Sequence, residues 1–595
     1  MMPLPPSVSS RPRRPRAASC RPAARPPRRL AALAAALLSV GAACGAPPAR
    51  GEGTVQGKEQ PDEVVLGSAF GSYLAGRFAA TETDTRYAAD ALLAALRDDP
   101  EQPELLQRAF MATVLDGRPE AQTLARRLPD NPIAILVLGA GDAEAGRWDR
   151  AEARFRTLPR QGVLPVLNPL LIAWSQQGRG LPDQALATLR PQVEAGQLRP
   201  LYALHAAMIA DLADRPQEAA RLIRIAVGDA RQPQNLRLAQ IAAGILARAG
   251  QAAEGQGLLD RLGGTSEELA LAVTGAGGRA ALSERAVGNA AQGIAEAELA
   301  LAAALRGQGS PDFALVLTRL ALRLRPDFPA ARLLAAEIQA DGRHDDAALA
   351  LLAEVPATDP LAPVVTLRRA VLLDRLGRED EAVALLRRLA EARPEAVQPW
   401  SRLGDLQRSH SRWPEAVAAY DEALKRIPTL GAGDWPLLYA RGISLERAGQ
   451  WPRAEADLQR ALQLAPEQPY LLNYLGYTWV EQGRNLTQAR AMLQRAVELR
   501  PQDGNIADSL GWALFRLGDI PGAITWMEKA VELEPRNSTV NDHLGDVYWA
   551  AGRQREAQFQ WRRALTLDPE PGEAPKIEAK LRDGLPSGPA SAALR

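Results

Sequence analysis

The side chains that most often bind metals or carry catalysis are few in this sequence and lie far apart. Its four histidines are His205, His344, His410 and His543, and no His-Glu-x-x-His motif is present. A zinc hydrolase of that type needs two histidines on one helix face with a glutamate beside them. Aspartates and glutamates are plentiful, but they are scattered along helical segments, where a solvated face is the usual explanation. We therefore expect no metal site.

The sequence also offers few residues for a disulfide, a cysteine-ligated metal site or a phosphate-binding loop. Only Cys20 and Cys44 are present, so residues 45–595 can form neither a disulfide nor a cysteine-ligated zinc site. The glycine-rich run Gly275-x-Gly277-Gly278 is the only candidate loop for a cofactor. A dinucleotide-binding loop follows a strand, and no strand signal precedes this run. The sequence thus predicts a protein that is not an enzyme and that carries no cofactor.

Charge is distributed unevenly along the chain. Residues 1–29 contain eight arginines and no acidic residue, whereas the other 63 basic and 70 acidic residues give a net charge of −7. An acidic body does not suit a phosphate backbone, so nucleic acid is not expected as a partner.

A signal peptide is predicted within residues 1–44. The Arg- and Pro-rich start is followed by eleven small and apolar residues, Leu30–Val40, and then by small residues. This order of basic, apolar and small stretches is typical of secretory signals, and the apolar run is too short to span a membrane. The pair Arg28–Arg29 directly before it leaves a twin-arginine route open.

Cys44 is the candidate lipidation site. It ends the run Val40-Gly41-Ala42-Ala43-Cys44, which resembles a bacterial lipobox, although Gly41 stands where Leu is usual. Cleavage near Ala42 or Ala43 without lipidation is the alternative. The prolines and glycines of residues 45–67 predict a flexible tether. We therefore expect a periplasmic protein. If Cys44 is lipidated, the more specific prediction is an outer-membrane lipoprotein, attached to the membrane by its lipid anchor only.

A repeat of about 34 residues fills the C-terminal third. The small residues Gly404, Gly442, Gly476, Gly511 and Gly545 follow one another at spacings of 38, 34, 35 and 34 residues. Downstream of them come an Ala-x-x-x-apolar pattern and a proline, as in Ala489-x-x-x-Leu493 and Pro501. Apolar residues at i, i+3, i+4 and i+7 predict two amphipathic helices in each unit. A glycine past the first helix and a proline past the second would end them.

This pattern resembles the tetratricopeptide repeat, W-x-x-L-G-x-x-Y…A-x-x-x-F…P over 34 residues, and Trp400-x-x-Leu403-Gly404 carries its first part. Fainter copies run upstream, with small residues at Gly76, Gly139, Ala173, Ala207, Ala243, Ala302, Ala335 and Ala370. The resemblance implies an all-α, right-handed superhelical solenoid of about fourteen helix pairs whose stacked units share one continuous core.

Domain boundaries follow from the register of the repeats. The step from Ala243 to Ala302 is longer than one repeat, and we interpret the excess as an irregular joint with an extra helix at Glu267–Val273. The expected segments are a leader (1–44), a tether (45–67), N-terminal repeats (68–262), the joint (263–289), central repeats (290–396), well-formed C-terminal repeats (397–570) and a capping helix with a tail (571–595).

The resemblance also implies a binding surface. In such solenoids the first helix of each pair lines the concave wall, so its residues that face away from the second helix are expected to be exposed in a groove. Exposed aromatic side chains beside hydrogen-bonding groups suit a protein or peptide ligand. By register, the groove residues are Tyr470, Asn473, Tyr477, Asp508, Trp512, Phe515, Arg516, Asp542, Asp546 and Trp549.

The most direct functional prediction is a non-catalytic scaffold or adaptor in the bacterial cell envelope that binds proteins or peptides in this groove. The runs 475–511 and 541–549 are also similar to exported proteobacterial repeat lipoproteins that act as adaptors. That similarity implies a periplasmic protease or a wall-modifying enzyme as partner. Two alternatives remain open: an envelope enzyme whose site is not recognisable in the sequence, and a cytoplasmic assembly protein.

Overall fold

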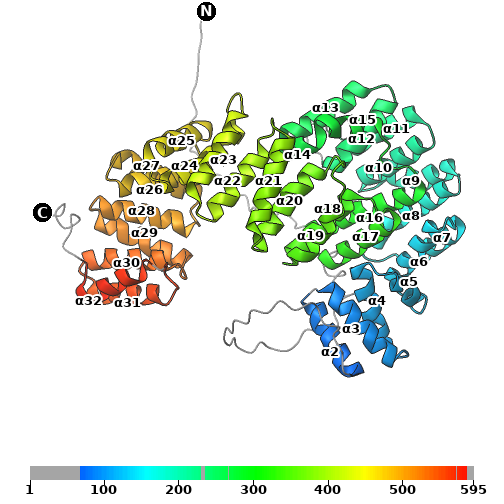
Figure 1. The fold of residues 1–595 in the computed structure, drawn as a ribbon, viewed down its shortest axis with the longest axis horizontal. Coiled ribbons are helices and arrows are strands. Elements are labelled where there is room, and N and C mark those ends of the chain that lie inside the picture. Colours follow the sequence, from blue (N-terminus) through cyan, green and yellow to red (C-terminus); the bar gives the residue numbers. More distant parts are fainter. Residues whose placement is uncertain (1–67, 83, 229–234, 266, 571, 586–595) are drawn as a thin grey trace, which may run out of the picture. The chain divides into compact units, whose positions relative to one another are not determined.

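The computed structural model describes residues 68–82, 84–228, 235–265, 267–570 and 572–585, and over these residues the chain is helical (Figure 1). The first helices are α2 (Ala69–Thr81), α3 (Thr85–Asp98), α4 (Pro103–Asp116), α5 (Glu120–Ala125), α6 (Pro132–Glu144), α7 (Trp148–Arg156), α8 (Leu164–Gly178), α9 (Pro182–Ala195), α10 (Arg199–Leu212), α11 (Pro216–Val227), α12 (Leu236–Arg248), α13 (Ala252–Thr265), α14 (Glu267–Val273), α15 (Gly275–Ser283), α16 (Ala290–Gly307) and α17 (Pro311–Leu324). They are followed by α18 (Pro329–Asp341), α19 (Asp345–Ala353), α20 (Ala362–Arg375), α21 (Glu379–Ala392), α22 (Gln398–Ser409), α23 (Trp413–Lys425), the short 3₁₀-helix η1 (Ala432–Asp434), α24 (Trp435–Arg447), α25 (Trp451–Leu464), α26 (Pro469–Glu481), α27 (Leu486–Leu499), α28 (Gly504–Arg516), α29 (Ile520–Leu533), α30 (Ser538–Ala550), α31 (Gln554–Leu565) and α32 (Ala574–Asp583).

Consecutive helices pack on each other in pairs such as α2–α3, α16–α17 and α28–α29. In chain order, the described residues contain six successive helix pairs from α2–α3 to α12–α13 and eight more from α16–α17 to α30–α31. The predicted all-α fold of about fourteen helix pairs is therefore confirmed. The extra helix expected at Glu267–Val273 is α14, and the expected capping helix is α32.

The small residue of each first helix is explained by its contact with the second helix. A Cβ at Gly404 would lie 2.5 Å from the ring of Tyr420, and a Cβ at Gly545 would lie 2.4 Å from the ring of Trp561. Any larger residue at these positions would push the paired helices apart. After the first helices, Gly449, Gly483, Gly518 and Gly552 adopt φ values of +66° to +83°, a backbone conformation in which glycine ends a helix at little cost.

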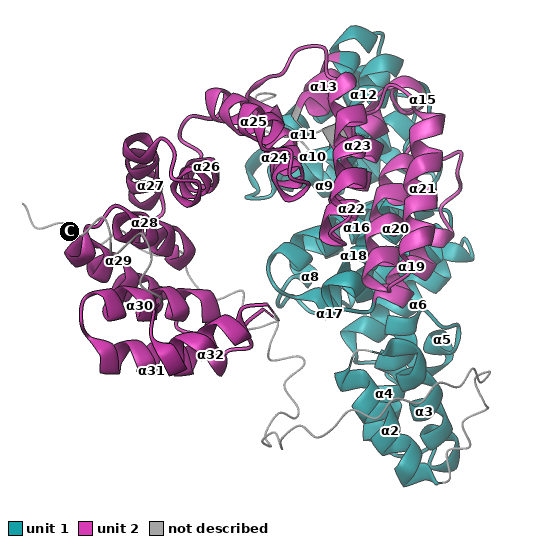
Figure 2. Cartoon of the chain, turned by 60° about the vertical axis from the view of Figure 1, so that its left-hand side comes forward, with its two compact units in different colours: residues 1–256, 281–344 teal, residues 257–280, 345–595 magenta. Residues whose placement is uncertain are grey.

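The chain forms two compact units whose borders do not follow the order of the sequence (Figure 2). Unit 1 comprises residues 1–256 and 281–344, and unit 2 comprises residues 257–280 and 345–595. Residues of the expected joint and of the expected central repeats are therefore divided between the two units.

The glycine-rich run of the joint is helical, which corrects its interpretation as a loop. Gly275, Gly277 and Gly278 belong to α15, and Gly263 and Gly264 lie in the last turn of α13. A Cβ at Gly277 would lie 2.2 Å from the carbonyl oxygen of Ala272, so glycine is needed there for a close turn between α14 and α15.

Within unit 1, the hairpin formed by α16 and α17 lies on the first helices of the earlier pairs. Helix α16 packs against α6, α8 and α10, and α17 packs against α4 and α6. These four partners are all first helices, so the hairpin covers the face that they turn away from their second helices, here called the inner face. The general expectation that inner-face residues are exposed is therefore wrong for this part of unit 1.

Within unit 2, two short helices cover the ends of the inner face. Helix α14 packs against the first helix α20, and Glu268 of α14 lies 2.8 Å from Arg368 of α20 and 3.7 Å from Arg402 of α22. At the other end, Lys580 of α32 contacts Asp542 at 2.8 Å and Asp546 at 2.7 Å, both on the first helix α30. The inner face between them, on α24, α26 and α28, is the part that these helices leave uncovered.

Candidate functional site: the inner face of α24, α26 and α28

A row of aromatic side chains begins on α24. The rings of Trp435 and Tyr439 lie 6.1 Å apart, and Tyr439 meets Tyr474 of α26 edge to face at 5.6 Å. The hydroxyl of Tyr474 donates to Glu446 Oε2 at 3.3 Å, and burial together with Glu446 raises the pKa of Tyr474. All three rings are partly buried against the core and partly exposed. Aromatic groups in this state supply large contact area with little loss of rotamer freedom.

A second cluster joins α26 to α28. The indole Nε1 of Trp512 donates to Glu481 Oε1 at 2.5 Å, and Arg516 Nη1 donates to the same oxygen at 3.2 Å. Tyr477 lies beside them: burial raises the pKa of its hydroxyl, and the carboxylates of Glu481 and Asp508 raise it further. Tyr477 is therefore uncharged at neutral pH and can donate a hydrogen bond to a ligand.

His543 of α30 completes this cluster. Its ring stacks on Trp512 with centroids 4.2 Å apart and an interplanar angle of 19°, and its Nδ1 lies 3.0 Å from Asp508 Oδ2. Burial disfavours the charged imidazole, but the carboxylates of Asp508, Asp546 and Asp542 outweigh that effect and raise the pKa of His543. A protonated imidazole over the face of an indole adds a cation–π attraction to the ion pair.

The carboxylates at the C-terminal end are paired within the chain. Burial raises the pKa of Asp546 to about 6, although Lys580 opposes the shift, and the indole Nε1 of Trp561 donates to Asp546 Oδ1 at 2.9 Å. Burial alone would lower the pKa of Lys580, but Asp546 and Asp542 raise it. Lys580 therefore stays charged and holds α32 against α30.

The ten residues that the sequence predicted for the groove lie in three kinds of environment. Tyr470 is 40% exposed, with Arg500 over its ring at 5.7 Å, and Arg516 is also exposed. Partly exposed are Asn473, Tyr477, Trp512 and Trp549. Buried are Asp508, Phe515, Asp542 and Asp546. The expectation that these residues are exposed is therefore wrong for the last four. Asp508 is paired with His543, and Phe515 packs on Trp512. Lys580 covers the two carboxylates of α30.

Four further residues lie in this region that the repeat register did not predict: Trp435, Tyr439, Tyr474 and His543. Tyr439 precedes Gly442 by three positions, as Asn473 precedes Gly476, so the same register could have found it. Tyr474 and His543 stand two positions before Gly476 and Gly545, where the side chain turns towards the neighbouring first helix. Asn473 was expected to hydrogen-bond a ligand; its Oδ1 is buried without a partner among the described residues.

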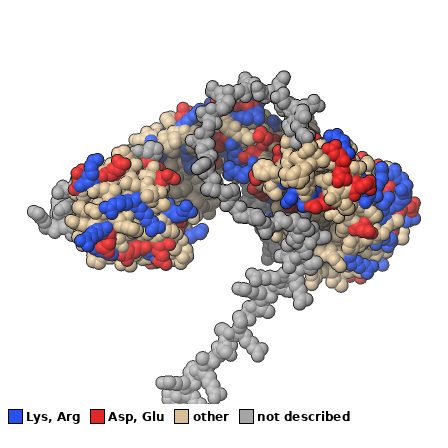
Figure 3. All heavy atoms as spheres, turned by 90° about the horizontal axis from the view of Figure 1, so that it is seen from below, with Lys and Arg blue, Asp and Glu red and all other residues tan. Residues whose placement is uncertain are grey.

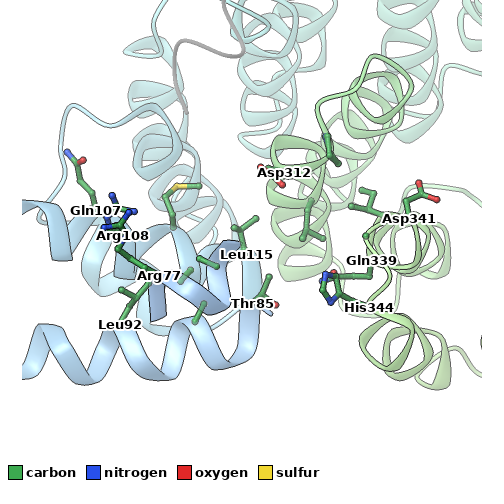
Figure 4. Close-up of a pocket in the computed structure, with 18 of the residues that line it drawn as sticks. Arg77, Thr85, Leu92, Gln107, Arg108, Leu115, Asp312, Gln339, Asp341 and His344 are labelled. Atoms are coloured by element: carbon green, nitrogen blue, oxygen red, sulfur yellow. The ribbon is translucent and has the colours of Figure 1, made fainter. Parts of the chain in front are cut away.

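A separate cavity of about 560 Å³ lies within unit 1 (Figure 4). One wall comes from α2–α4 and carries Arg77, Gln107 and Arg108, whereas the opposite wall comes from α17 and α18 and carries Asp312 and Asp341. Its apolar lining includes Leu92, Met111, Leu115, Leu315 and Ile338.

The described residues contain no group of three or more His, Cys, Asp or Glu side chains that could hold a metal ion. Over the same residues, no helix combines the length and the apolar character that crossing a membrane requires. On the face shown in Figure 3, basic and acidic side chains are interspersed, and that face carries no continuous basic stripe of the kind that binds a phosphate backbone.

Comparisons with known proteins agree with the repeat pattern. The family model described as tetratricopeptide repeat matches residues 367–430, 439–503 and 481–538. A curated TPR repeat-containing protein of Pseudomonas aeruginosa is 26% identical over 158 residues, which cover 26% of this chain and 26% of the relative. The chain thus spans about a quarter of the length of that relative. The predicted resemblance to tetratricopeptide repeats is confirmed.

Solved structures are similar at lower levels of identity. The structure of the APC/C hetero-tetramer Cut9–Hcn1 has a chain that is 14% identical, with a TM-score of 0.36, and the match covers 88% of this chain and 97% of that one. YrrB, described as a TPR protein with an unusual peptide-binding site, is 22% identical with a TM-score of 0.26, over 32% of this chain and 97% of YrrB. A MamA structure is 26% identical with a TM-score of 0.25, over 28% of this chain and 97% of MamA.

Proposed function

We propose that this chain, a tetratricopeptide-repeat protein, is a scaffold or adaptor of the bacterial cell envelope that binds partner proteins or peptides on the inner face of α24, α26 and α28. Tetratricopeptide repeats indicate protein–protein interaction, and proteins of this family are generally non-catalytic. The observation that supports the proposal is which parts of the inner face are covered by other helices of the same chain. The chain's own helices cover the inner face of α4–α10, α20 and α30, and they leave the aromatic stretch between them accessible.

The chemistry of this stretch supports protein binding. Tyr439, Tyr477 and Trp512 are partly exposed and anchored by the core below them, which lowers the entropy cost of ordering them on binding. Tyrosine, tryptophan and arginine are the residue types most enriched where protein interfaces gain their free energy. Glu481 and Arg516 beside them can fix the orientation of a partner by hydrogen bonds.

Site-directed photocrosslinking tests this proposal. A photoreactive amino acid at position 470, on the exposed edge of the site, should capture a partner in cells, and the additional change Trp512→Ala should reduce that capture at least tenfold. A reactive group at position 559 serves as the matched control, because Phe559 is 59% exposed but lies on the second helix α31. Equal capture from both positions, or capture that Trp512→Ala leaves unchanged, would exclude the inner face as the binding surface.

The proposed location in the envelope is supported by the leader sequence, which lies outside the described residues. The basic, apolar and small stretches of residues 1–44 favour export, and Cys44 after them favours lipidation. Similarity to exported repeat lipoproteins favours a periplasmic protease or a wall-modifying enzyme as the partner. An outer-membrane anchor would hold such an enzyme near its substrates.

Cys44→Ser tests the anchor. One acyl chain binds membranes only marginally, and a lipobox cysteine carries a diacylglyceryl group and often an additional acyl chain. The wild-type protein should therefore sediment with membranes, whereas Cys44→Ser should appear in the soluble periplasm with unchanged thermal stability. Cys20→Ser is the control and should leave fractionation unchanged. A soluble wild-type protein would rule out the anchor, and a cytosolic one would rule out export.

A further inference from the structure

Three inner-face positions of unit 1 recur at the candidate site of unit 2. Glu144 follows Gly139 by five residues on α6, Trp174 follows Ala173 by one on α8, and His205 precedes Ala207 by two on α10. In unit 2, Glu481, Trp512 and His543 stand at the same offsets from the repeat residues Gly476, Gly511 and Gly545, on the consecutive first helices α26, α28 and α30.

In both units, the tryptophan and histidine of these positions are in direct contact. Trp174 donates from Nε1 to Nδ1 of His205 at 3.0 Å, with the rings edge to face at 6.2 Å. Trp512 and His543 are in contact as well, but they stack at 4.2 Å. The two sets of three residues, here called the unit 1 triad and the unit 2 triad, are thus equivalent in sequence register and share the contact between tryptophan and histidine.

The unit 1 triad shows what such a surface accepts, because the α16–α17 hairpin occupies it. Gly293 of α16 lies against Trp174 so closely that a Cβ at Gly293 would come within 2.2 Å of the indole. Arg323 of α17 donates from Nε and Nη2 to Glu144 Oε2, each at 3.0 Å. The occupant is therefore helical, with a glycine over the tryptophan and an arginine on the glutamate, and it buries Trp174 and His205 completely.

The unit 2 triad keeps the features that this mode of binding needs. Trp512 and His543 remain partly exposed, and Glu481 is exposed. Trp512 and Arg516 both contact Oε1 of Glu481. An arginine from a ligand could therefore pair with this carboxylate from the solvent side, as Arg323 pairs with Glu144.

We infer that the partner presents an α-helical hairpin to the unit 2 triad, with a glycine or alanine over Trp512 on one helix and an arginine to Glu481 on the other. This inference rests on the proposed function and specifies the shape and chemistry of its ligand. An extended peptide would use the same aromatic side chains, but it would not require a small residue at Trp512.

The chain's own hairpin supplies a defined probe. Residues 289–325 are fused to a carrier protein, and circular dichroism first establishes that the fused hairpin is helical. The fusion is then titrated against the full-length protein, and binding is measured by calorimetry with the carrier alone as blank. Saturable binding is expected, with a Kd at least tenfold weaker for the protein variant Trp512→Ala and several-fold weaker for Glu481→Gln. Phe559→Ala should leave the Kd unchanged.

Changes in the probe separate helix docking from non-specific association. Gly293→Leu in the probe should abolish binding, because the added side chain clashes with the indole, whereas Gly307→Ala should retain it, since a Cβ at Gly307 has no neighbour within 4 Å. Absence of binding, or binding that ignores Trp512→Ala or Gly293→Leu, would overturn the inference. If photocrosslinking from position 470 still captures a partner in a Trp512-dependent manner, the proposed function stands and only its helical ligand is wrong.

Discussion

The inner face of unit 1 and the inner face of unit 2 are built from the same kind of helix pair, yet they differ in what covers them. In unit 1 the α16–α17 hairpin seals Trp174 and His205 from solvent, so the pair has become part of a core. In unit 2 the equivalent Trp512 and His543 lie between two short covering helices and remain partly exposed. The same positions therefore serve stability in one unit and are available for binding in the other.

The electrostatics of the two pairs differ accordingly. His205 has no carboxylate beside it, and burial lowers its pKa to about 3. His543 is mostly buried, but Asp508, Asp546 and Asp542 outweigh the effect of burial and raise its pKa. Burial alone thus favours the neutral imidazole of His205, whereas the neighbouring carboxylates favour the charged imidazole of His543.

The largest difference is expected from removing the tryptophans. Trp174→Ala leaves a cavity under the hairpin and should destabilise unit 1 by about 3–5 kcal/mol. Trp512→Ala removes a partly solvated ring and should destabilise unit 2 by only about 1 kcal/mol, a cost typical of surface-near sites. Hydrogen exchange of α8, α10 and α16 compared with α28 and α30 measures both. Similar losses in both units would contradict the distinction between a core pair and a surface pair.

A smaller difference in stability is expected between alanine substitutions at two glycines of α16. Gly293→Ala places a methyl group against Trp174 and should destabilise unit 1 by about 1–3 kcal/mol, the usual cost of overpacking. Gly307→Ala meets nothing within 4 Å and should stabilise α16 by up to about 1 kcal/mol through helix propensity. Thermal unfolding of the two variants gives the comparison. If both behave alike, close docking of α16 on α8 is wrong.

The pairing of helices could be predicted from the sequence because local patterns determine it. A small residue such as Gly476, a left-handed glycine such as Gly483 and a proline such as Pro501 each act within one repeat, so their spacing alone locates both helices. The return of α16–α17 onto α4–α10 could not be predicted in this way. Ala302 has the register of any stacked repeat, and the contact between Arg323 and Glu144 joins residues 179 positions apart.

The candidate site could be predicted only in part for the same reason. Register placed Tyr477 and Trp512 on the inner face, where they lie. It could not foresee that Lys580, from a helix outside the repeat pattern, would cover Asp542 and Asp546. It also overlooked His543, because the pattern of a single repeat does not show which side chains reach the neighbouring first helix.

The two histidines should give the two units opposite pH dependence. The pKa of His205 is lower in the folded state than the usual 6.5, so the stability of unit 1 is fully present above pH 6.5 and is lost as the pH falls. Between pH 7.5 and pH 5 this loss should be about 2 kcal/mol. The pKa of His543 is raised, so its contribution to unit 2 is fully present below pH 6.5 and is lost as the pH rises through its folded pKa.

Asp546 strengthens the response of unit 2. Its pKa is raised to about 6, so its folded environment also favours the protonated form, and stability falls as the pH rises through that value. Hydrogen exchange at pH 5 and pH 7.5, corrected for intrinsic rates, should show unit 1 losing protection in acid and unit 2 keeping it. His543→Gln should reduce the response of unit 2 and leave that of unit 1 intact; a parallel response in both units would refute the assignment.

The smallest expected effect concerns the covering helix α32, where two lysines on one helix form a matched pair. Lys580→Met removes the cation between Asp542 and Asp546 and should destabilise the packing of α32 by about 1–2 kcal/mol, less than the full cost of breaking a buried pair because Lys580 retains some exposure. Lys576→Met breaks only a surface contact with Glu573 at 2.7 Å and should cost less than about 0.5 kcal/mol.

Because Asp546 takes up a proton near pH 6, the effect of Lys580→Met should shrink at pH 5. Faster hydrogen exchange in α32 and α30 of Lys580→Met at pH 7.5, without a change in α26, would show that α32 limits the accessible inner face. If α26 loosened equally, α32 would instead be an integral part of the whole C-terminal core.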